Sequence, residues 1–252
     1  MLDATDGRPG DGAPFGVGTA QAVSLSLFRF DTLYEKHWAL WQMLLSRWKL
    51  KALPDIQFMK MVGAGTREGF YPYPNFGVYG VLAAWPSLAH AQAQVEGAAV
   101  FRNYRRHAAE ALTLYLTPVR AKGRWSGREP FAPVETPETP LPVAAITRAT
   151  IRPRHALSFW RRTPAIRAEI PDQPHLLFKL GMAEFPWVNQ ITFTIWDDLD
   201  AMGAFAYRPG GPHSEAIHAA RSNGWFAEEL YARFKVVGKD GAWSDAPRLS
   251  AI

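Results

Sequence analysis

The chain has 252 residues, of which 48% are hydrophobic and 20% are charged, and this suits a folded protein with a sizeable core in one or two domains. It contains no cysteine, which excludes disulfides, thiolate nucleophiles, cysteine-bound iron–sulfur clusters and thiolate-ligated haem. The formal net charge of +5 comes from scattered basic residues without a dense Lys/Arg block, so nucleic-acid binding is not expected.

Residues 1–21 are rich in glycine and aspartate and lack the basic and apolar regions of a secretory signal. We expect a disordered leader there and a cytoplasmic protein. The longest uncharged stretch, 70–95, is interrupted by Pro72, Pro74 and Pro86, so it is not expected to span a membrane.

The first half of the chain alternates between strand and helix periodicity. Apolar residues at Trp38, Trp41, Leu45 and Trp48 have helical spacing. The patterns predict, in order, a strand at 23–30, a helix at 37–48, strands at 57–62 and 77–85, a largely helical stretch at 88–112 and a strand at 113–120.

The second half repeats this order. We predict a strand at 143–151, a helix at 154–160, strands at 176–182 and 189–196, two helical pieces within 199–230 and a strand at 231–237. The two halves also align directly, since "AEALTLYLTPVRAKGRW" from Ala109 matches "AEELYARFKVVGKDGAW" from Ala227 without a gap. Shorter matches centre on Arg29 and Arg148 and on Lys60 and Lys179.

Strand, helix, strand, strand, helix, strand is the order of a ferredoxin-like unit. The predicted fold is therefore α+β, with tandem duplicated ferredoxin-like units forming an intramolecular arrangement like a dimeric α/β barrel. The expected boundaries are a first unit at 22–125, a proline-rich linker at 126–142, a second unit at 143–243 and a tail at 244–252.

Five segments spread over nearly the whole chain resemble the spheroidene monooxygenase family: "SLSLFRFD", "GAGTREGFYPYPNFGVY", "ITRATIRP", "FKLGMAEFP" and "GGPHSEAIHAARSNGWFAEELYARF". The resemblance implies a haem-dependent monooxygenase that introduces a keto group at C2 of acyclic carotenoids, converting spheroidene to spheroidenone. It also implies dioxygen as oxidant, reduced ferredoxin as electron donor, and kinship with the haem proteins of the dimeric α/β barrel group.

Such a haem needs an axial ligand, and without cysteine the first choice is a neutral imidazole. Among seven histidines, His213 follows a Gly-Gly-Pro turn in a segment that the first half lacks, and it is expected to begin a helix. We predict His213 as the haem iron ligand. The alternatives are that His213 caps that helix or lies in a surface loop, or that another histidine is the ligand.

Arg29 and Arg148 occupy equivalent positions in the first strand of each half, in phase with apolar residues. A haem propionate could pair with either one, so both are predicted to bind the cofactor; the alternative is a strand-end arginine in solvent or a structural ion pair. Aromatic residues of "GFYPYPN" and "EFPWVN", at matching places in the two halves, are candidates to line a tunnel for a polyene.

Residues 37–54 mix tryptophan and leucine with Arg47, Lys49 and Lys51. This composition suits a helix that rests on an anionic membrane, at the inner or photosynthetic membrane, as well as an ordinary core helix with cations at its C-terminal end. We favour the core helix. Two other functions also fit the predicted fold: a cofactor-free α/β-barrel oxygenase, and a non-catalytic protein that binds haem or carotenoid.

Overall fold

A computed structural model describes residues 20–66, 73–135, 142–161, 173–207 and 222–251. Its first half contains three helices and four strands: β1 (Ala22–Arg29), α1 (Leu33–Lys51), β2 (Phe58–Gly65), β3 (Pro74–Trp85), α2 (Leu88–Gly97), α3 (Ala99–His107) and β4 (Glu110–Gly123). The predicted order of a ferredoxin-like unit is confirmed, although residues 110–112 belong to β4 and not to the preceding helix.

The second half contains β5 (Val143–Ile151), the short helix η1 (Pro153–His155) that runs on into an α-helical turn at 156–161, β6 (Leu176–Ala183), β7 (Asn189–Trp196), α5 (Leu199–Tyr207), β8 (Phe226–Gly241) and η2 (Pro247–Ala251). The prediction that the helical region extends to residue 230 is wrong. Residues 226–230 are in β8, where Leu230 is the register partner of Arg148 on β5 and of Gly123 on β4.

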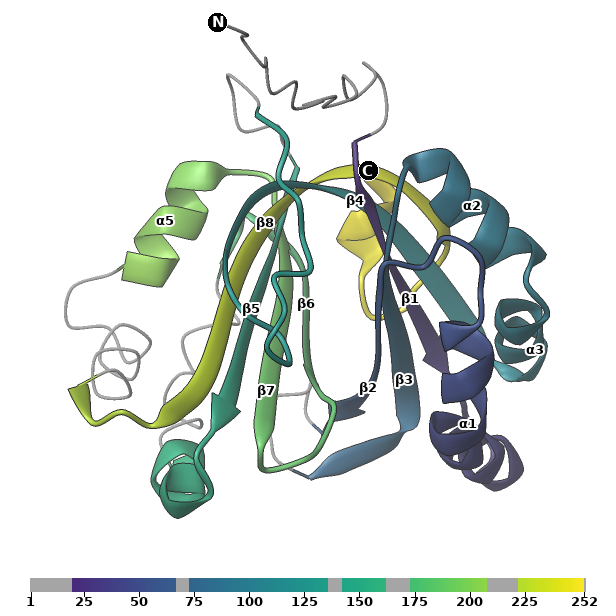
Figure 1. The fold of residues 1–252 in the computed structure, drawn as a ribbon, viewed down its shortest axis with the longest axis horizontal. Coiled ribbons are helices and arrows are strands. Elements are labelled where there is room, and N and C mark those ends of the chain that lie inside the picture. Colours follow the sequence, from purple (N-terminus) through teal and green to yellow (C-terminus); the bar gives the residue numbers. More distant parts are fainter. Residues whose placement is uncertain (1–19, 67–72, 136–141, 162–172, 208–221, 252) are drawn as a thin grey trace, which may run out of the picture.

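The eight strands form one closed antiparallel barrel in the order β1-β3-β2-β6-β7-β5-β8-β4 (Figure 1). Each unit contributes four neighbouring strands, so the barrel has two seams between units. The β4–β8 seam is long, with register partners from Leu112 and Gly241 to Gly123 and Leu230. The β2–β6 seam is short and consists of the pairs Gly63 with Ala183 and Ala64 with Met182.

The duplication is visible in the geometry of the β4–β8 seam. Gly123 and Gly241 occupy matching positions and both have positive φ angles, +103° and +83°. A Cβ on Gly123 would lie 2.2 Å from the carbonyl oxygen of Glu229, and one on Gly241 would lie 2.1 Å from that of Ala111. Each strand therefore ends at a glycine because the partner backbone leaves no room for a side chain.

The barrel interior is filled by side chains. Alternate residues of every strand, such as Leu25, Ile146 and Phe193, form one buried cluster. Phe131, from the segment assigned to the linker, and Leu249, from the segment assigned to the tail, are buried in the same cluster. Residues that follow β4 and β8 thus complete the core.

The outer surfaces of the two units differ. α1, α2 and α3 cover the first unit's strands and bury a second apolar cluster that includes Phe28, Trp85 and Tyr104 (Figure 1). On the second unit the cluster around Val143, Trp196 and Met202 is small, and α5 packs there against β7. Within the part of the chain that the structure describes, every helix is too short or too polar to cross a lipid bilayer.

Candidate functional site

An apolar cleft lies at the short β2–β6 seam. Its volume is about 230 Å³, and its walls come from both units, including Leu40, Met43, Tyr73, Tyr79, Trp160 and Trp187. Two of the proposed aromatic segments meet here, because Tyr73 of the first half and Trp187 of the second are in edge-to-face contact, with ring centroids 5.7 Å apart. Phe70 and Tyr71 lie outside the described residues.

A tight turn between β6 and β7 places Trp187 at the cleft. Trp187 has a φ of +69°, which is uncommon for a residue with a side chain. The turn is held by Asn189, whose backbone N–H donates to the Phe185 carbonyl at 3.1 Å while its side-chain oxygen accepts from the Phe185 N–H at 3.2 Å. Trp160 donates from its indole nitrogen to the Trp187 carbonyl at 3.0 Å, which fixes the same turn from outside.

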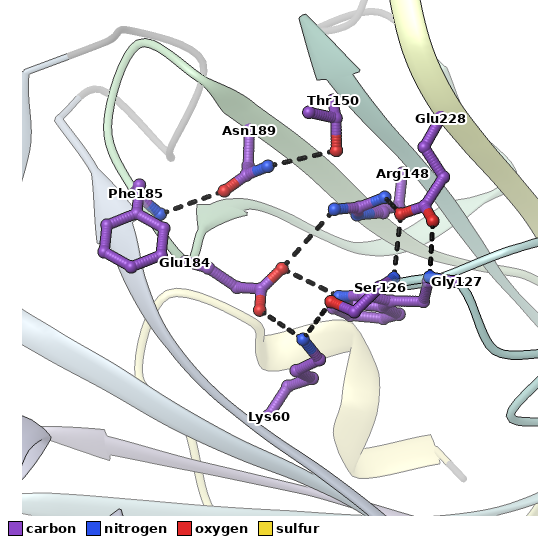
Figure 2. A network of polar contacts seen from close by, with 10 residues as sticks. Lys60, Ser126, Gly127, Arg148, Thr150, Glu184, Phe185, Asn189 and Glu228 are labelled. Carbon is purple, nitrogen blue, oxygen red and sulfur yellow. Dashed lines mark hydrogen bonds and ion pairs between the residues drawn. The ribbon is translucent and has the colours of Figure 1, made fainter.

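One of the residues that line the cleft, Glu184, is the centre of a network of largely buried charges (Figure 2). Lys60 donates to its Oε1 at 2.6 Å, the indole nitrogen of Trp125 donates to its Oε2 at 2.7 Å, and Arg148 lies 3.6 Å from the same oxygen. Only 13% of the Lys60 side chain, 4% of Arg148 and 14% of Glu184 is exposed. These charges are stable inside the protein because each one is paired and hydrogen-bonded.

Glu228 completes the network on the far side of Arg148. Its carboxylate pairs with the Arg148 guanidinium and accepts from the backbone N–H groups of Ser126 at 2.8 Å and Gly127 at 2.7 Å. Partial burial opposes ionisation of this carboxyl, but the two backbone donors and Arg148 outweigh it and lower the pKa of Glu228. The two cations, Lys60 and Arg148, are thus balanced by two carboxylates.

Arg29 occupies the equivalent place in the first unit. It lies 3.6 Å from Glu110, pairs with Asp245, and its guanidinium carbon lies 4.7 Å from the centre of the Trp243 ring. Glu110 accepts from the backbone N–H of Ser244 at 2.9 Å, as Glu228 does from Ser126. The structure therefore contains the ion pairs of the alternative interpretation at both arginines, and propionate binding by Arg29 or Arg148 stays a prediction.

The predicted iron ligand His213 lies outside the described residues, as does His218. The other five histidines have local partners. His37 contacts the Leu33 carbonyl, His90 the Ser87 hydroxyl, His107 the Glu35 carboxylate and His175 the Asp197 carboxylate, while His155 stacks on Trp225. Among residues with described positions, no three of His, Asp and Glu cluster as metal ligands would.

The outward face of the second sheet carries small side chains at its centre and cations at its edges. Because Ile146 and Ile191 point into the barrel, their strand neighbours point outward. Two rows of register partners cross this face: Tyr231, Thr147, Thr192 and Gly181, and beside them Arg233, Ala145, Thr194 and Lys179. The centre of both rows is small, Thr147 is exposed, and cations stand at both ends of the second row. A planar macrocycle with carboxylate side chains fits these features.

Neither Glu184 nor Glu228 was predicted from the sequence as a site residue. A signal for Glu228 was present, since Glu110 and Glu228 occupy the same place in the gapless internal match, followed in both halves by Trp-Ser, at Trp125 and Trp243. Glu184 has no such counterpart. Its partner Lys60 is 124 residues away in the chain, so only the folded structure brings the two together.

Two ferredoxin-like units closed into one barrel, with an apolar cleft at a seam between them, define this chain as a duplicated α/β-barrel protein. Solved aldoxime dehydratases share this fold: one, in complex with butyraldoxime, superposes with a TM-score of 0.59 over 86% of this chain and 80% of its own, at 9% identity. A second has a TM-score of 0.54 over 90% of this chain and 83% of its own, also at 9% identity.

Among curated relatives, spheroidene monooxygenase of Rhodobacter capsulatus is 46% identical over 88% of this chain and 92% of its own length. That of Cereibacter sphaeroides is 43% identical over 88% of this chain and 69% of its own, and that of Rubrivivax gelatinosus is 32% identical over 75% and 72%. No protein-family model matches the chain. The chain belongs to the spheroidene monooxygenase family, and it is an enzyme of the monooxygenase class.

Proposed function

We propose that this enzyme is a carotenoid monooxygenase that introduces a keto group at C2 of acyclic carotenoids and converts spheroidene to spheroidenone. The observation that carries the proposal is the 46% identity with a spheroidene monooxygenase over 88% of the chain. An aligned length of 223 residues is too long to lie within one unit, so the similarity extends into both units.

The cleft supports a polyene substrate. Its walls are mainly aliphatic and aromatic, and the charged wall residue Glu184 is already bonded within the protein, whereas the buried hydroxyl of Tyr79 has no hydrogen-bond partner. A hydrocarbon chain would therefore not displace the bonds of Glu184 on entering, and the aromatic rings of Tyr73 and Trp187 would contact its conjugated bonds. In this proposal the residues of the cleft walls bind the substrate, orient it and exclude water.

The proposed cofactor is haem, which supplies activation of dioxygen when bound. His213 would hold its iron, and the small side chains at the centre of the outward face of the second sheet would accept the ring. On that face Lys179 and Arg233 are the cations that could pair with its propionates. Arg148 is in phase with Ile146, which points into the barrel, so Arg148 would pair with a propionate only if the ring lay on the other side of the sheet.

The chemistry requires an external electron source. Each hydroxylation of C2 consumes one dioxygen, two electrons and two protons and releases one water; two rounds give a geminal diol, which loses water to form the ketone. Because the chain has no cysteine to bind an iron–sulfur cluster, reduced ferredoxin is the proposed donor. We place the enzyme in the cytoplasm, in peripheral contact with the inner or photosynthetic membrane that holds its substrate.

The test compares the wild type with His213→Ala after expression with ample haem. We expect a Soret absorption band and dioxygen-dependent formation of the ketone in the wild type, and loss of both in the variant. His175→Ala is the matched control, because His175 is half-exposed and bonded to Asp197, and it should keep both.

Other outcomes separate the alternatives. If His213→Ala retains the band, another histidine is the ligand. If the wild type lacks a band but oxygenates the carotenoid, the enzyme is a cofactor-free oxygenase. If the wild type binds haem or carotenoid without turnover, it is a non-catalytic binding protein.

A further inference from the structure

α1 presents its largest apolar side chains to solvent. Trp41 is 62% exposed, Leu44 65% and Trp48 76%, and at about 100° per residue these positions share one side of the helix. The side that faces the barrel carries Ala39 and Ser46, which are buried. The interpretation of this segment as an ordinary core helix is therefore wrong for Trp41, Leu45 and Trp48, which are all exposed. An ordinary amphipathic helix would turn these apolar side chains toward the core and its polar side chains toward solvent.

The exposed apolar surface continues beyond α1. Across the described parts of the chain, the other large exposed hydrophobic side chains lie just before or at the start of β3, in the β6–β7 turn, and at Leu157 after η1. All of these segments lie at the lower end of the barrel in Figure 1, whereas α2 and α5 lie at the upper end. Large apolar side chains gathered at one end of a protein surface often mark a site that binds another molecule or a membrane.

Positive charge borders this apolar end. α1 contains Lys36, Arg47, Lys49 and Lys51 but only one carboxylate, Glu35, which is bonded to His107 at 2.8 Å. A groove of about 290 Å³ between α1 and α3 is lined by Lys49, Arg102 and Arg106. Cations beside an exposed apolar helix face are complementary to anionic lipid headgroups above an acyl layer.

The apolar end is continuous with the cleft. Leu40 of α1, exposed on the same helix, is also a wall of the cleft, and so are Tyr73, Phe76 and Trp187, which are exposed at its rim. A surface laid against this end of the protein would therefore cover the mouth of the cleft.

We propose that this end of the barrel docks onto an anionic phospholipid bilayer. The Trp and Leu side chains of α1 enter the interface, and Lys49, Arg102 and Arg106 bind headgroup phosphates in the groove. On the proposed function, an apolar substrate then passes from the acyl layer into the cleft without crossing water. A second copy of the chain is less suited to cover this surface. A twofold contact through α1 would bring the cations of the two copies close together, and they would repel each other.

The experiment is flotation of the full-length protein with vesicles of phosphatidylcholine, alone or mixed with phosphatidylglycerol, without carotenoid. We expect the wild type to float with the mixed vesicles, less with neutral ones, and less at high salt. Trp41→Ser/Leu44→Ser/Trp48→Ser should lower partitioning at least about tenfold, because three exposed apolar side chains no longer enter the interface. Circular dichroism should show that this variant remains folded.

A second variant tests the charges. Lys49→Gln/Arg102→Gln/Arg106→Gln, which removes the cations of the groove, should lose about fivefold in binding to anionic vesicles for each cation removed. The matched control, Arg120→Gln/Lys122→Gln/Lys235→Gln, removes the same net charge from exposed positions on β4 and β8 and should bind nearly as the wild type does. Equal losses in the two triple variants would mean that net charge alone drives binding, and would overturn the proposal.

Two further results would also overturn it: unchanged flotation of the serine variant, or a wild-type dimer that the serine substitutions dissociate. Turnover of detergent-solubilised carotenoid separates this proposal from the proposed function. If turnover occurs but the protein does not bind vesicles, only the docking surface is wrong. If the protein binds vesicles as expected but no carotenoid is oxidised, only the proposed function is wrong.

Discussion

At the scale of single residues, the buried ion network at the cleft makes Glu228 sensitive to acid. Arg148 is almost fully buried, and its guanidinium is shared between Glu228 and Glu184. Two backbone N–H groups of the Trp125 segment also bond to Glu228, so this one carboxylate joins the barrel wall to the chain that follows β4.

We predict that Glu228→Gln lowers the free energy of unfolding by about 1–3 kcal/mol at neutral pH, because the buried guanidinium of Arg148 loses one of its two anionic partners. Since the pKa of Glu228 is lowered in the folded state, its stabilisation is present above the ordinary value of 4.5 and is lost as the pH falls through the folded pKa. The variant should therefore lose less stability than the wild type below about pH 4.5. Urea titrations across acidic pH measure this.

The control for that prediction is Glu129→Gln. Glu129 makes an exposed ion pair with Arg124 at 3.7 Å, and exposed pairs contribute about 0–1 kcal/mol. A Glu228→Gln protein that follows the wild-type pH curve would contradict the assignment of acid sensitivity to this carboxylate.

At the scale of elements, the ends of β4 and β8 depend on glycine for the same reason. Both Gly123 and Gly241 combine a positive φ with a partner carbonyl oxygen in the place where a Cβ would stand. Glycine recurs at the same place of both halves because the backbone at the end of each strand needs a positive φ and has no room for a Cβ. After each glycine the chain turns back, and later residues such as Phe131 and Leu249 reach the barrel core.

We expect Gly123→Ala and Gly241→Ala each to cost at least about 2 kcal/mol, because the new methyl group meets backbone that cannot rotate away. For a chain of this size that lowers Tm by roughly 4–8 °C. Gly97→Ala is the control, since a Cβ there would meet nothing within 4 Å. Differential scanning calorimetry measures the Tm of each variant, and the same Tm for all three variants would contradict this prediction.

At the scale of the whole molecule, the barrel closes unevenly. The β4–β8 seam has bulges but runs almost the length of both strands, whereas the β2–β6 seam is held by two register pairs and borders the cleft. On the proposed function a substrate enters the cleft beside the β2–β6 seam, and the seam with the fewest register pairs is the one that can open most easily.

We predict that backbone amides at the β2–β6 seam, near Gly63 and Ala183, exchange with deuterium faster than those of the β4–β8 seam near Leu114 and Val236. Opening the short seam breaks few hydrogen bonds and exposes a cleft that is already apolar. Hydrogen exchange with peptide-level mass spectrometry measures it. Equal protection at both seams would show that the barrel opens as one unit.

The sequence by itself determined the architecture of two ferredoxin-like units, because strand and helix periodicities are local and the gapless match from Ala109 and Ala227 repeats them. It did not determine where β8 begins, since residues 226–230 take strand geometry only through pairing with β4 and β5. Nor did it show which side of α1 faces outward, because apolar residues occur all around that helix. The ion-pair partners of Arg148 could not be predicted from the sequence either, because Glu228 lies 80 residues away in the chain. Such features depend on contacts between distant segments, and only the closed barrel brings these segments together.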